Sequence, residues 1–214
     1  MKDDKAENIF DKYHKEYDAW YIKNGFAYLS ELEAVKKVLP KEGKGLEVGV
    51  GTGRFASVLG IKYGIDPSEK MLKIAKQRGV KVKLADGENL PFEDAVFDYA
   101  IAIISLCFTQ DPQKVLKEAN RVLREGGRIV IGIIDRDSFL GKSYLKKKSI
   151  FYEHAKLFSI KELARLLKKS GFGKFSYYQT IFSSLDKIDS IEVPQLGFGK
   201  GSFVVVSGDK AISI

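Results

Sequence analysis

Short apolar runs alternate with amphipathic segments through the middle of the chain. The apolar runs cover residues 44–50, 62–65, 80–85, 97–105 and 128–134. Each is short enough for one buried strand, and the segments between them suit helices. Because strands that alternate with helices form right-handed βαβ units, the pattern predicts a parallel sheet covered by helices.

Helix start signals support these boundaries. Asp66 follows the second apolar run as a plausible N-cap, Pro67 suits the first helical position, and Glu69 completes a capping box. Ser159 and Glu162 form a second capping box near the end of the chain. The sequence therefore predicts helices that begin after residue 66 and after residue 159.

The first forty residues carry a stripe of large side chains. These are Ile9, Phe10, Tyr13, Tyr17, Trp20 and Tyr21, which recur at helical spacing. Residues 5–39 are predicted to be helical, with a second piece from Ala27 to Leu39. One interpretation places the stripe in the core. The other makes residues 1–40 a helical lid over a ligand.

Residues 136–158 break the alternating rhythm, and we expect them to cover a substrate. They contain aromatic residues and a basic run, Lys142, Lys146, Lys147 and Lys148. The run suits either an anionic acceptor or plain solvent exposure. Two β-rich stretches, 174–182 and 202–207, close the chain and are predicted to pair antiparallel at one edge. The whole chain is expected to form one domain.

Composition narrows the class of protein. The chain has 214 residues, 44% of them hydrophobic, which suffices for one well-formed core. Cys107 is the only cysteine, so neither a disulfide framework nor a cysteine-based metal site is expected. The charged N-terminus is unlike a signal peptide, and the longest apolar stretch is too short to span a membrane. We therefore expect a soluble, cytoplasmic protein.

The formal net charge is +8, and lysine and glutamate are abundant. A lysine-rich surface is the simple interpretation of this charge, and attraction to RNA or an anionic small molecule is the other. The same composition is common in heat-adapted proteins.

A glycine-rich loop follows the first apolar run. Gly49, Gly51 and Gly53 alternate with other residues, and Glu47 precedes them. Missing Cβ atoms let the backbone approach a ligand closely. A dinucleotide-binding loop would have its third glycine at position 54, which is Arg54 here. An acid before the loop suits a ligand with a cationic group.

Four motifs, taken together, resemble those of class I S-adenosylmethionine-dependent methyltransferases. The motifs lie in residues 46–53, 64–72, 85–98 and 121–127. The nearest likeness is to the small-molecule group related to the ubiquinone and menaquinone methyltransferases, and it extends over residues 10–207. It implies a Rossmann-like α/β fold with a seven-stranded, mostly parallel sheet. The implied order is 3-2-1-4-5-7-6, with one antiparallel edge pair and helices on both faces.

The resemblance also implies cofactor contacts at the ends of the first two strands. Glu47 would face the methionine ammonium, and the backbone from Gly49 through Gly51 to Gly53 would receive the methionine end. Asp66 would accept hydrogen bonds from both ribose hydroxyls, which its two oxygens suit. Two further residues, Pro67 and Met71, would pack on one face of the adenine.

Contacts at the next strands follow from the same resemblance. Asp86 would accept from the exocyclic amine of the adenine, with the backbone of Gly87 and Glu88 at the ring edge. Ala102 and Ile103 would supply a backbone carbonyl near the methionine ammonium. Tyr13 would close over the cofactor from the N-terminal helix.

Methyl transfer by in-line displacement needs no covalent intermediate, so alignment alone can supply much of the rate. A catalytic residue is therefore not required. His14 and His154 are the only histidines and hence the candidates for a chemical role. Many relatives have a histidine pair after the fourth strand, where this chain has Cys107 and Phe108.

A small-molecule acceptor is the leading prediction. The Asn/Asp-Pro-Pro-aromatic motif of amino-methylating nucleic-acid enzymes is replaced by residues 103–106, Ile-Ile-Ser-Leu. Acids follow the fifth strand at Asp135 and Asp137 but not the fourth until Asp111, so no metal site is expected. An RNA methyltransferase with a basic surface and a non-catalytic S-adenosylmethionine-binding protein are the alternatives.

Overall fold

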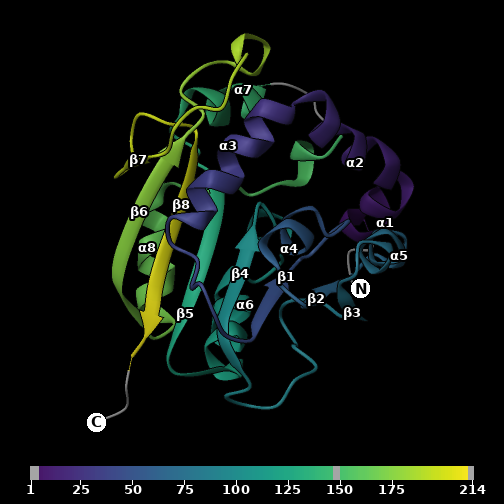
Figure 1. Ribbon diagram of the computed structural model, residues 1–214, viewed down its shortest axis with the longest axis vertical. Helices are drawn as coiled ribbons and strands as arrows, with labels where there is room; N and C mark the ends of the chain where they lie inside the picture. Colours follow the sequence, from purple (N-terminus) through teal and green to yellow (C-terminus); the bar gives the residue numbers. More distant parts are fainter. Residues whose placement is uncertain (1–4, 147–149, 212–214) are drawn as a thin grey trace.

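The computed structural model describes residues 5–146 and 150–211. Eight of the described segments are strands of a single mixed sheet in the order β3-β2-β1-β4-β5-β8-β6-β7. Their bounds are β1 Gly45–Val48, β2 Tyr63–Asp66, β3 Lys81–Leu84, β4 Phe97–Ile103, β5 Leu123–Ile134, β6 Phe172–Thr180, β7 Gln195–Leu196 and β8 Phe203–Lys210. The predicted Rossmann-like α/β fold is confirmed (Figure 1).

Strands β1 to β5 run parallel, whereas β8 is antiparallel to both of its neighbours, β5 and β6. If the two-residue β7 is set aside, the order matches the predicted 3-2-1-4-5-7-6. β7 lies in the polar link before β8 and pairs with Tyr178 and Gln179 of β6. Both of its residues are exposed, so no apolar pattern marks it in the sequence.

Helices cover both faces of the sheet. α6 Pro112–Val122 and α8 Ile160–Lys169 bury their apolar sides on one face. α3 Gly25–Lys36, α4 Arg54–Leu59 and α5 Glu69–Gln77 bury theirs on the other. This two-sided cover explains why the central strands are almost wholly apolar.

The N-terminal segment differs from its prediction. It forms three helices, α1 Lys5–Lys12, α2 His14–Lys23 and α3, rather than two. Tyr13 and Asn24 stand at the breaks between them. The predicted single stripe is therefore divided between α1, which carries Ile9 and Phe10, and α2, which carries Tyr17, Trp20 and Tyr21. Figure 1 shows α1 and α2 above the carboxyl ends of β1 and β2.

β5 begins at Leu123, five residues before the predicted start at Arg128. α6 ends at Val122, so the residues 124–127 that were expected to end the helix belong to the strand instead. The register shifts between Phe97 and Tyr99 of the neighbouring β4, and Gly126 has a positive φ. An irregular stretch of strand lacks the apolar periodicity from which strands are predicted, so the early start of β5 could not be predicted from the sequence.

The segment between β5 and α8 contains α7 Phe139–Lys146 and a short 3₁₀ turn at Tyr152–His154. Two further 3₁₀ turns lie at Leu106–Phe108 and Leu185–Lys187. Lys147 and Lys148 of the predicted basic run lie outside the described residues. Lys142 and Lys146 are exposed.

Candidate cofactor-binding site

A cavity of about 400 Å³ lies where the carboxyl ends of β1, β2, β3 and β4 meet. Predicted site residues from the first two strand ends line it, namely Gly49, Gly51, Asp66, Pro67 and Met71. Those from the next two strand ends do so as well, namely Asp86, Gly87, Glu88 and Ile103. Open α/β sheets bind ligands at this edge. The structure thus brings together most of the residues that the sequence nominated.

The glycine loop has the backbone conformation that its sequence requires. Gly49, Gly51 and Gly53 all have positive φ, at 74°, 51° and 78°. A Cβ at Gly49 would lie 2.4 Å from the Cβ of Ser105, whose hydroxyl donates a hydrogen bond to the carbonyl of Val48 at 2.8 Å. The loop is therefore packed tightly against the residues that follow β4.

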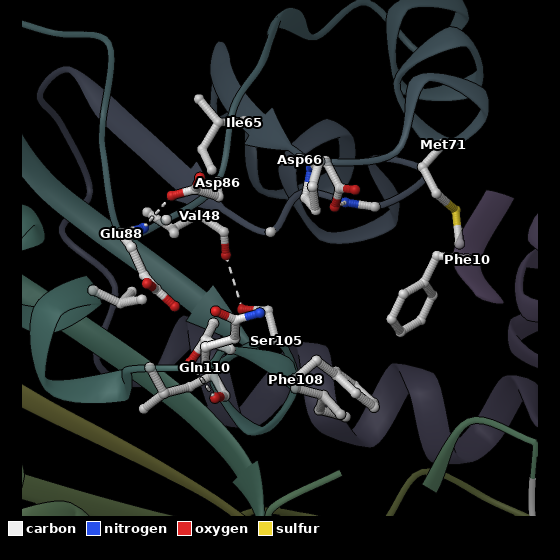
Figure 2. A pocket seen from close by; sticks show the side chains of 18 of the residues that line it. Phe10, Val48, Ile65, Asp66, Met71, Asp86, Glu88, Ser105, Phe108 and Gln110 are labelled. Atoms are coloured by element: carbon white, nitrogen blue, oxygen red, sulfur yellow. Dashed lines mark hydrogen bonds between the residues drawn. The ribbon is translucent and has the colours of Figure 1, made fainter. Parts of the chain in front are cut away.

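Asp66 sits at the end of β2 with both carboxylate oxygens engaged. Its Oδ2 accepts a hydrogen bond from the backbone N–H of Gly51 at 2.8 Å, and its Oδ1 accepts from that of Ser68 at 2.9 Å. Each carboxylate oxygen has two acceptor positions. Asp66 therefore fixes the glycine loop and still faces the cavity, as Figure 2 shows.

Asp86 orders the opposite wall of the cavity. Its Oδ1 accepts from the backbone N–H of Glu88 at 2.9 Å and from the Asn89 side chain at 3.2 Å. The Glu88 carboxylate in turn accepts from the backbone N–H of Asp111 at 2.9 Å. The wall is thereby fastened to the start of α6. Figure 2 shows Asp86 and Glu88 side by side on this wall.

Four of the nominated residues do not line the cavity. Glu47 is buried beneath the loop, where its carboxylate accepts a hydrogen bond from the backbone N–H of Ala56. Gly53 packs against Ala75, and Ala102 is buried within β4. Tyr13 is a partly buried residue at the break before α2.

Glu47 retains an oxygen, Oε2, that has no hydrogen-bond partner. Burial, with a smaller contribution from the negative charge of Asp66, raises the pKa of Glu47 well above its usual range. A buried carboxylate in this state favours a cationic neighbour. The predicted contact with the ammonium of the cofactor stays a prediction.

Aromatic side chains close the cavity on one side, and they come from residues 10–21 and 105–110, which the sequence predicts to line a substrate pocket. Phe10 and Tyr17 from the N-terminal helices line it together with Phe108. The rings of Phe10 and Phe108 meet edge to face, their centroids 4.9 Å apart (Figure 2). Phe151 stacks on Phe10 at 5.8 Å, so residues 136–158 reach the N-terminal helices. The rings of Tyr13 and Phe151 meet edge to face, with their centroids 6.3 Å apart.

Asp18 fastens α2 to the glycine loop. Its carboxylate accepts hydrogen bonds from the Thr52 hydroxyl at 2.7 Å and from the guanidinium groups of Arg54 and Arg78 at 2.7–2.9 Å. Burial opposes ionisation, but the donors from Arg78, Arg54 and Thr52 outweigh it and hold the pKa of Asp18 well below its usual range. Arg54, whose role the sequence left open, is thus a structural partner of Asp18.

The two histidines are placed differently. His14 does not line the cavity, and its Nδ1 lies 2.9 Å from the carbonyl oxygen of Asp11. The side chain of His154 lies outside the described part of the structure. Cys107 is buried, and burial raises the pKa of its thiol to about 12, which fits a small core residue rather than a nucleophile. Within the described residues, no three His, Cys, Asp or Glu side chains gather as metal ligands.

Gly49→Ala should destabilise the protein far more than Gly60→Ala. Both glycines have φ above +70°, but nothing lies within 4 Å of a Cβ added at Gly60. The left-handed backbone alone costs an alanine about 1–2 kcal/mol. Overlap with Ser105 should add about 2 kcal/mol at Gly49. Urea unfolding measures both variants, and equal losses of stability would contradict the close packing of the loop.

Comparisons with known proteins identify the class. The Methyltransferase domain family matches residues 46–131. A crystal structure of an S-adenosylmethionine-dependent methyltransferase from Thermotoga maritima, described as a possible histamine N-methyltransferase, is 48% identical. It covers 96% of this chain and 99% of its own, with a TM-score of 0.94. The chain therefore belongs to the S-adenosylmethionine-dependent methyltransferases.

Two other relatives extend the comparison. An uncharacterised protein of Methanocaldococcus jannaschii is 52% identical over 95% of this chain and 99% of its own length. The demethylmenaquinone methyltransferase of Bacillus cereus is 29% identical over 79% of this chain and 88% of its own. The resemblance to the menaquinone group is thus a distant one. Separately, none of the helices in the described ranges has the length and apolar character needed to cross a bilayer.

Proposed function

We propose that the protein transfers the methyl group of S-adenosylmethionine to a small-molecule acceptor held beneath the N-terminal helices. One observation carries the proposal: the cavity joins two different halves. Polar groups of the strand ends, such as Asp66 and Asp86, face one half, and the aromatic rings of Phe10, Tyr17 and Phe108 close the other. The aromatic half suits an organic molecule of modest size.

The residues present fit the cofactor. The glycine loop forms a cradle, in which Gly51 leaves space that a side chain would fill against Tyr17. Asp66 would bind the ribose hydroxyls, Pro67 and Met71 the adenine face, and Asp86 the adenine amine. Glu47 supplies a buried, unpartnered oxygen close behind the loop. These roles are consistent with a bound nucleoside that carries a cationic amino-acid end.

The bound cofactor supplies an electrophilic methyl group on a sulfonium. The protein's own contribution is to align the acceptor with that methyl and to exclude water. Alignment is worth up to about 7–11 kcal/mol of barrier reduction. The rings of Phe10, Tyr17 and Phe108 keep the aromatic half of the cavity apolar. We assign residues 1–40 the role of a lid and residues 136–158 that of an acceptor-covering insert.

The relatives favour a small acceptor over RNA. The Thermotoga maritima structure is described as a possible histamine N-methyltransferase, and the Bacillus cereus enzyme acts on demethylmenaquinone. Both names denote organic molecules rather than nucleic acids. The RNA alternative rests on the net charge of +8. It requires a basic surface continuous with the cavity, and among the described residues that line the cavity Lys114 alone is basic.

Transfer of a labelled methyl group tests this proposal. Incubation of the protein with labelled S-adenosylmethionine and a broad panel of amines, phenols, quinols and RNA should label a small molecule, with a rate that varies little between low and high salt. Labelling of RNA alone, with a steep loss of affinity in salt, would establish the RNA alternative. Cofactor binding without transfer to any acceptor would favour a binding protein.

A further inference from the structure

Glu31 is a buried carboxylate that the cofactor site does not explain. It lies on α3, its residue is 2% exposed, and its Oε2 has no hydrogen-bond partner. Within the described residues, only Glu47 shares this condition among the buried acids, and Glu47 has a backbone donor. Burial alone raises the pKa of Glu31 to about 8. A buried polar group without a partner costs stability, so we expect Glu31 to have a function.

Tyrosines from several elements lie near this carboxylate. Tyr28 is three residues before Glu31 on α3, and its ring meets that of Tyr21 edge to face with the centroids 5.1 Å apart. Burial is the largest cause that raises the pKa values of Tyr17, Tyr21, Tyr28, Tyr144 and Tyr152, and the charge of Glu31 is a smaller cause in each. The rings of Tyr144 and Tyr152 are stacked with their centroids 4.1 Å apart. Among the described residues, Glu31 forms no ion pair with a lysine or arginine, and burial is the cause of its raised pKa. The surroundings of Glu31 are thus aromatic and acidic.

The tyrosines near Glu31 adjoin the aromatic half of the cavity. Tyr17 lines the cavity, with its ring 3.6 Å from the position of a Cβ on Gly51, and its hydroxyl shares a hydrogen bond of 2.9 Å with that of Tyr21. Phe108 lines the cavity too, and its ring lies 6.3 Å from that of Tyr152. Tyr17, Tyr21 and Tyr28 therefore link the aromatic half of the cavity to α3, the helix that carries Glu31.

We propose that Glu31 and the tyrosines Tyr17, Tyr144 and Tyr152 form the recognition site for an ammonium group of the methyl acceptor, reached from the cavity past Tyr17. The carboxylate neutralises the ammonium, and tyrosine ring faces attract cations. This assignment deepens the proposed function and rests on it. Glu31 acts as a specificity residue that orients the acceptor, and it takes no part in bond making or breaking.

Glu31→Gln tests the proposal with almost no change of shape. Calorimetry with S-adenosylhomocysteine present measures acceptor binding without turnover. The probes are pairs of an amine and its neutral isostere, such as 2-phenylethylamine with 2-phenylethanol, together with alkyl and imidazolyl-ethyl pairs. In the wild type at least one amine should bind 10-fold or more tightly than its isostere. Glu31→Gln should abolish that preference, whereas Glu33→Gln, at a partly exposed position of the same helix, should keep it.

Separate readouts distinguish failure of this site from failure of the proposed function. Glu31→Gln should bind S-adenosylhomocysteine as the wild type does and should unfold at an equal or higher temperature, since it removes the free-energy cost of protonating a buried carboxyl group at neutral pH. A preference for amines that survives Glu31→Gln would overturn the recognition site, and so would a wild type that binds no amine better than its isostere. Neither result bears on cofactor binding. Loss of S-adenosylmethionine binding by the wild type would instead reject the proposed function.

Discussion

Asp66→Ala should raise the dissociation constant for S-adenosylmethionine by about 100- to 1,000-fold. If Asp66 binds the ribose as proposed, the change removes two charge-assisted hydrogen bonds to it, each worth about 1.5–3 kcal/mol. It also removes the acceptors for the backbone N–H groups of Gly51 and Ser68, which hold the glycine loop in place. Both losses act in the same direction. Isothermal titration with S-adenosylmethionine and with S-adenosylhomocysteine measures the effect.

Asp66→Asn separates the two contributions to that loss. Asparagine keeps one oxygen that can accept from Gly51 or Ser68, but its amide cannot accept from both ribose hydroxyls. Its affinity should lie between those of the wild type and Asp66→Ala. Glu69→Gln, at an exposed position three residues further on, is the matched control and should leave binding unchanged. An affinity for Asp66→Ala within 5-fold of the wild type would contradict the assignment of Asp66 to the ribose.

The cofactor half of the site was predictable because its signals are local. Asp66 and Asp86 directly follow apolar runs, and the carboxyl ends of parallel strands meet at one sheet edge. The alternating glycines need no tertiary information either, since the tolerance of positive φ is a property of glycine itself. The structure accordingly brings Gly49, Gly51, Asp66 and Asp86 to one cavity. Their individual contacts with the cofactor remain predictions.

The aromatic half was not predictable in the same detail, because it depends on where the helices break. Tyr13 stands at the break before α2. The rings of Tyr13 and Tyr17 both meet that of Phe151, but of these two tyrosines Tyr17 alone lines the cavity. No turn residue marks that break. Glu31 is likewise an ordinary helical glutamate in the sequence, and only packing against residues far along the chain makes it buried and unpartnered.

Asp18 illustrates the same limit, since its partners lie 34 to 60 residues away. Its carboxylate oxygens join α2 to the glycine loop and to the end of α5. No local sequence motif predicts these contacts. A second aspartate of the N-terminal helices, Asp11, accepts from the Ser68 hydroxyl and from the backbone N–H of Lys70. The two carboxylates therefore join the N-terminal helices to the glycine loop and to the start of α5.

Asp18→Ala should lower the free energy of unfolding by about 2–3 kcal/mol. Breaking a fully buried ion pair costs about 3–5 kcal/mol, and this pair is worth less because 18% of the Asp18 side chain is exposed to solvent. For a domain of this size the melting temperature should fall by about 5–10 °C. Hydrogen exchange should accelerate over α2 and the glycine loop. Glu16→Gln, an exposed acid on α2, is the control and should change neither quantity.

The pH dependence of stability tests whether the charge of Asp18 stabilises the fold. Because the folded state holds the pKa of Asp18 below the unfolded value of about 3.9, the carboxylate stabilises the fold above that value. The stabilisation is lost as the pH falls through the folded pKa. Asp18→Asn should therefore be less stable than the wild type at neutral pH and approach it below about pH 3. A stability difference that stays constant from pH 7 to pH 2 would show that packing, rather than the charge of Asp18, joins the N-terminal helices to the glycine loop.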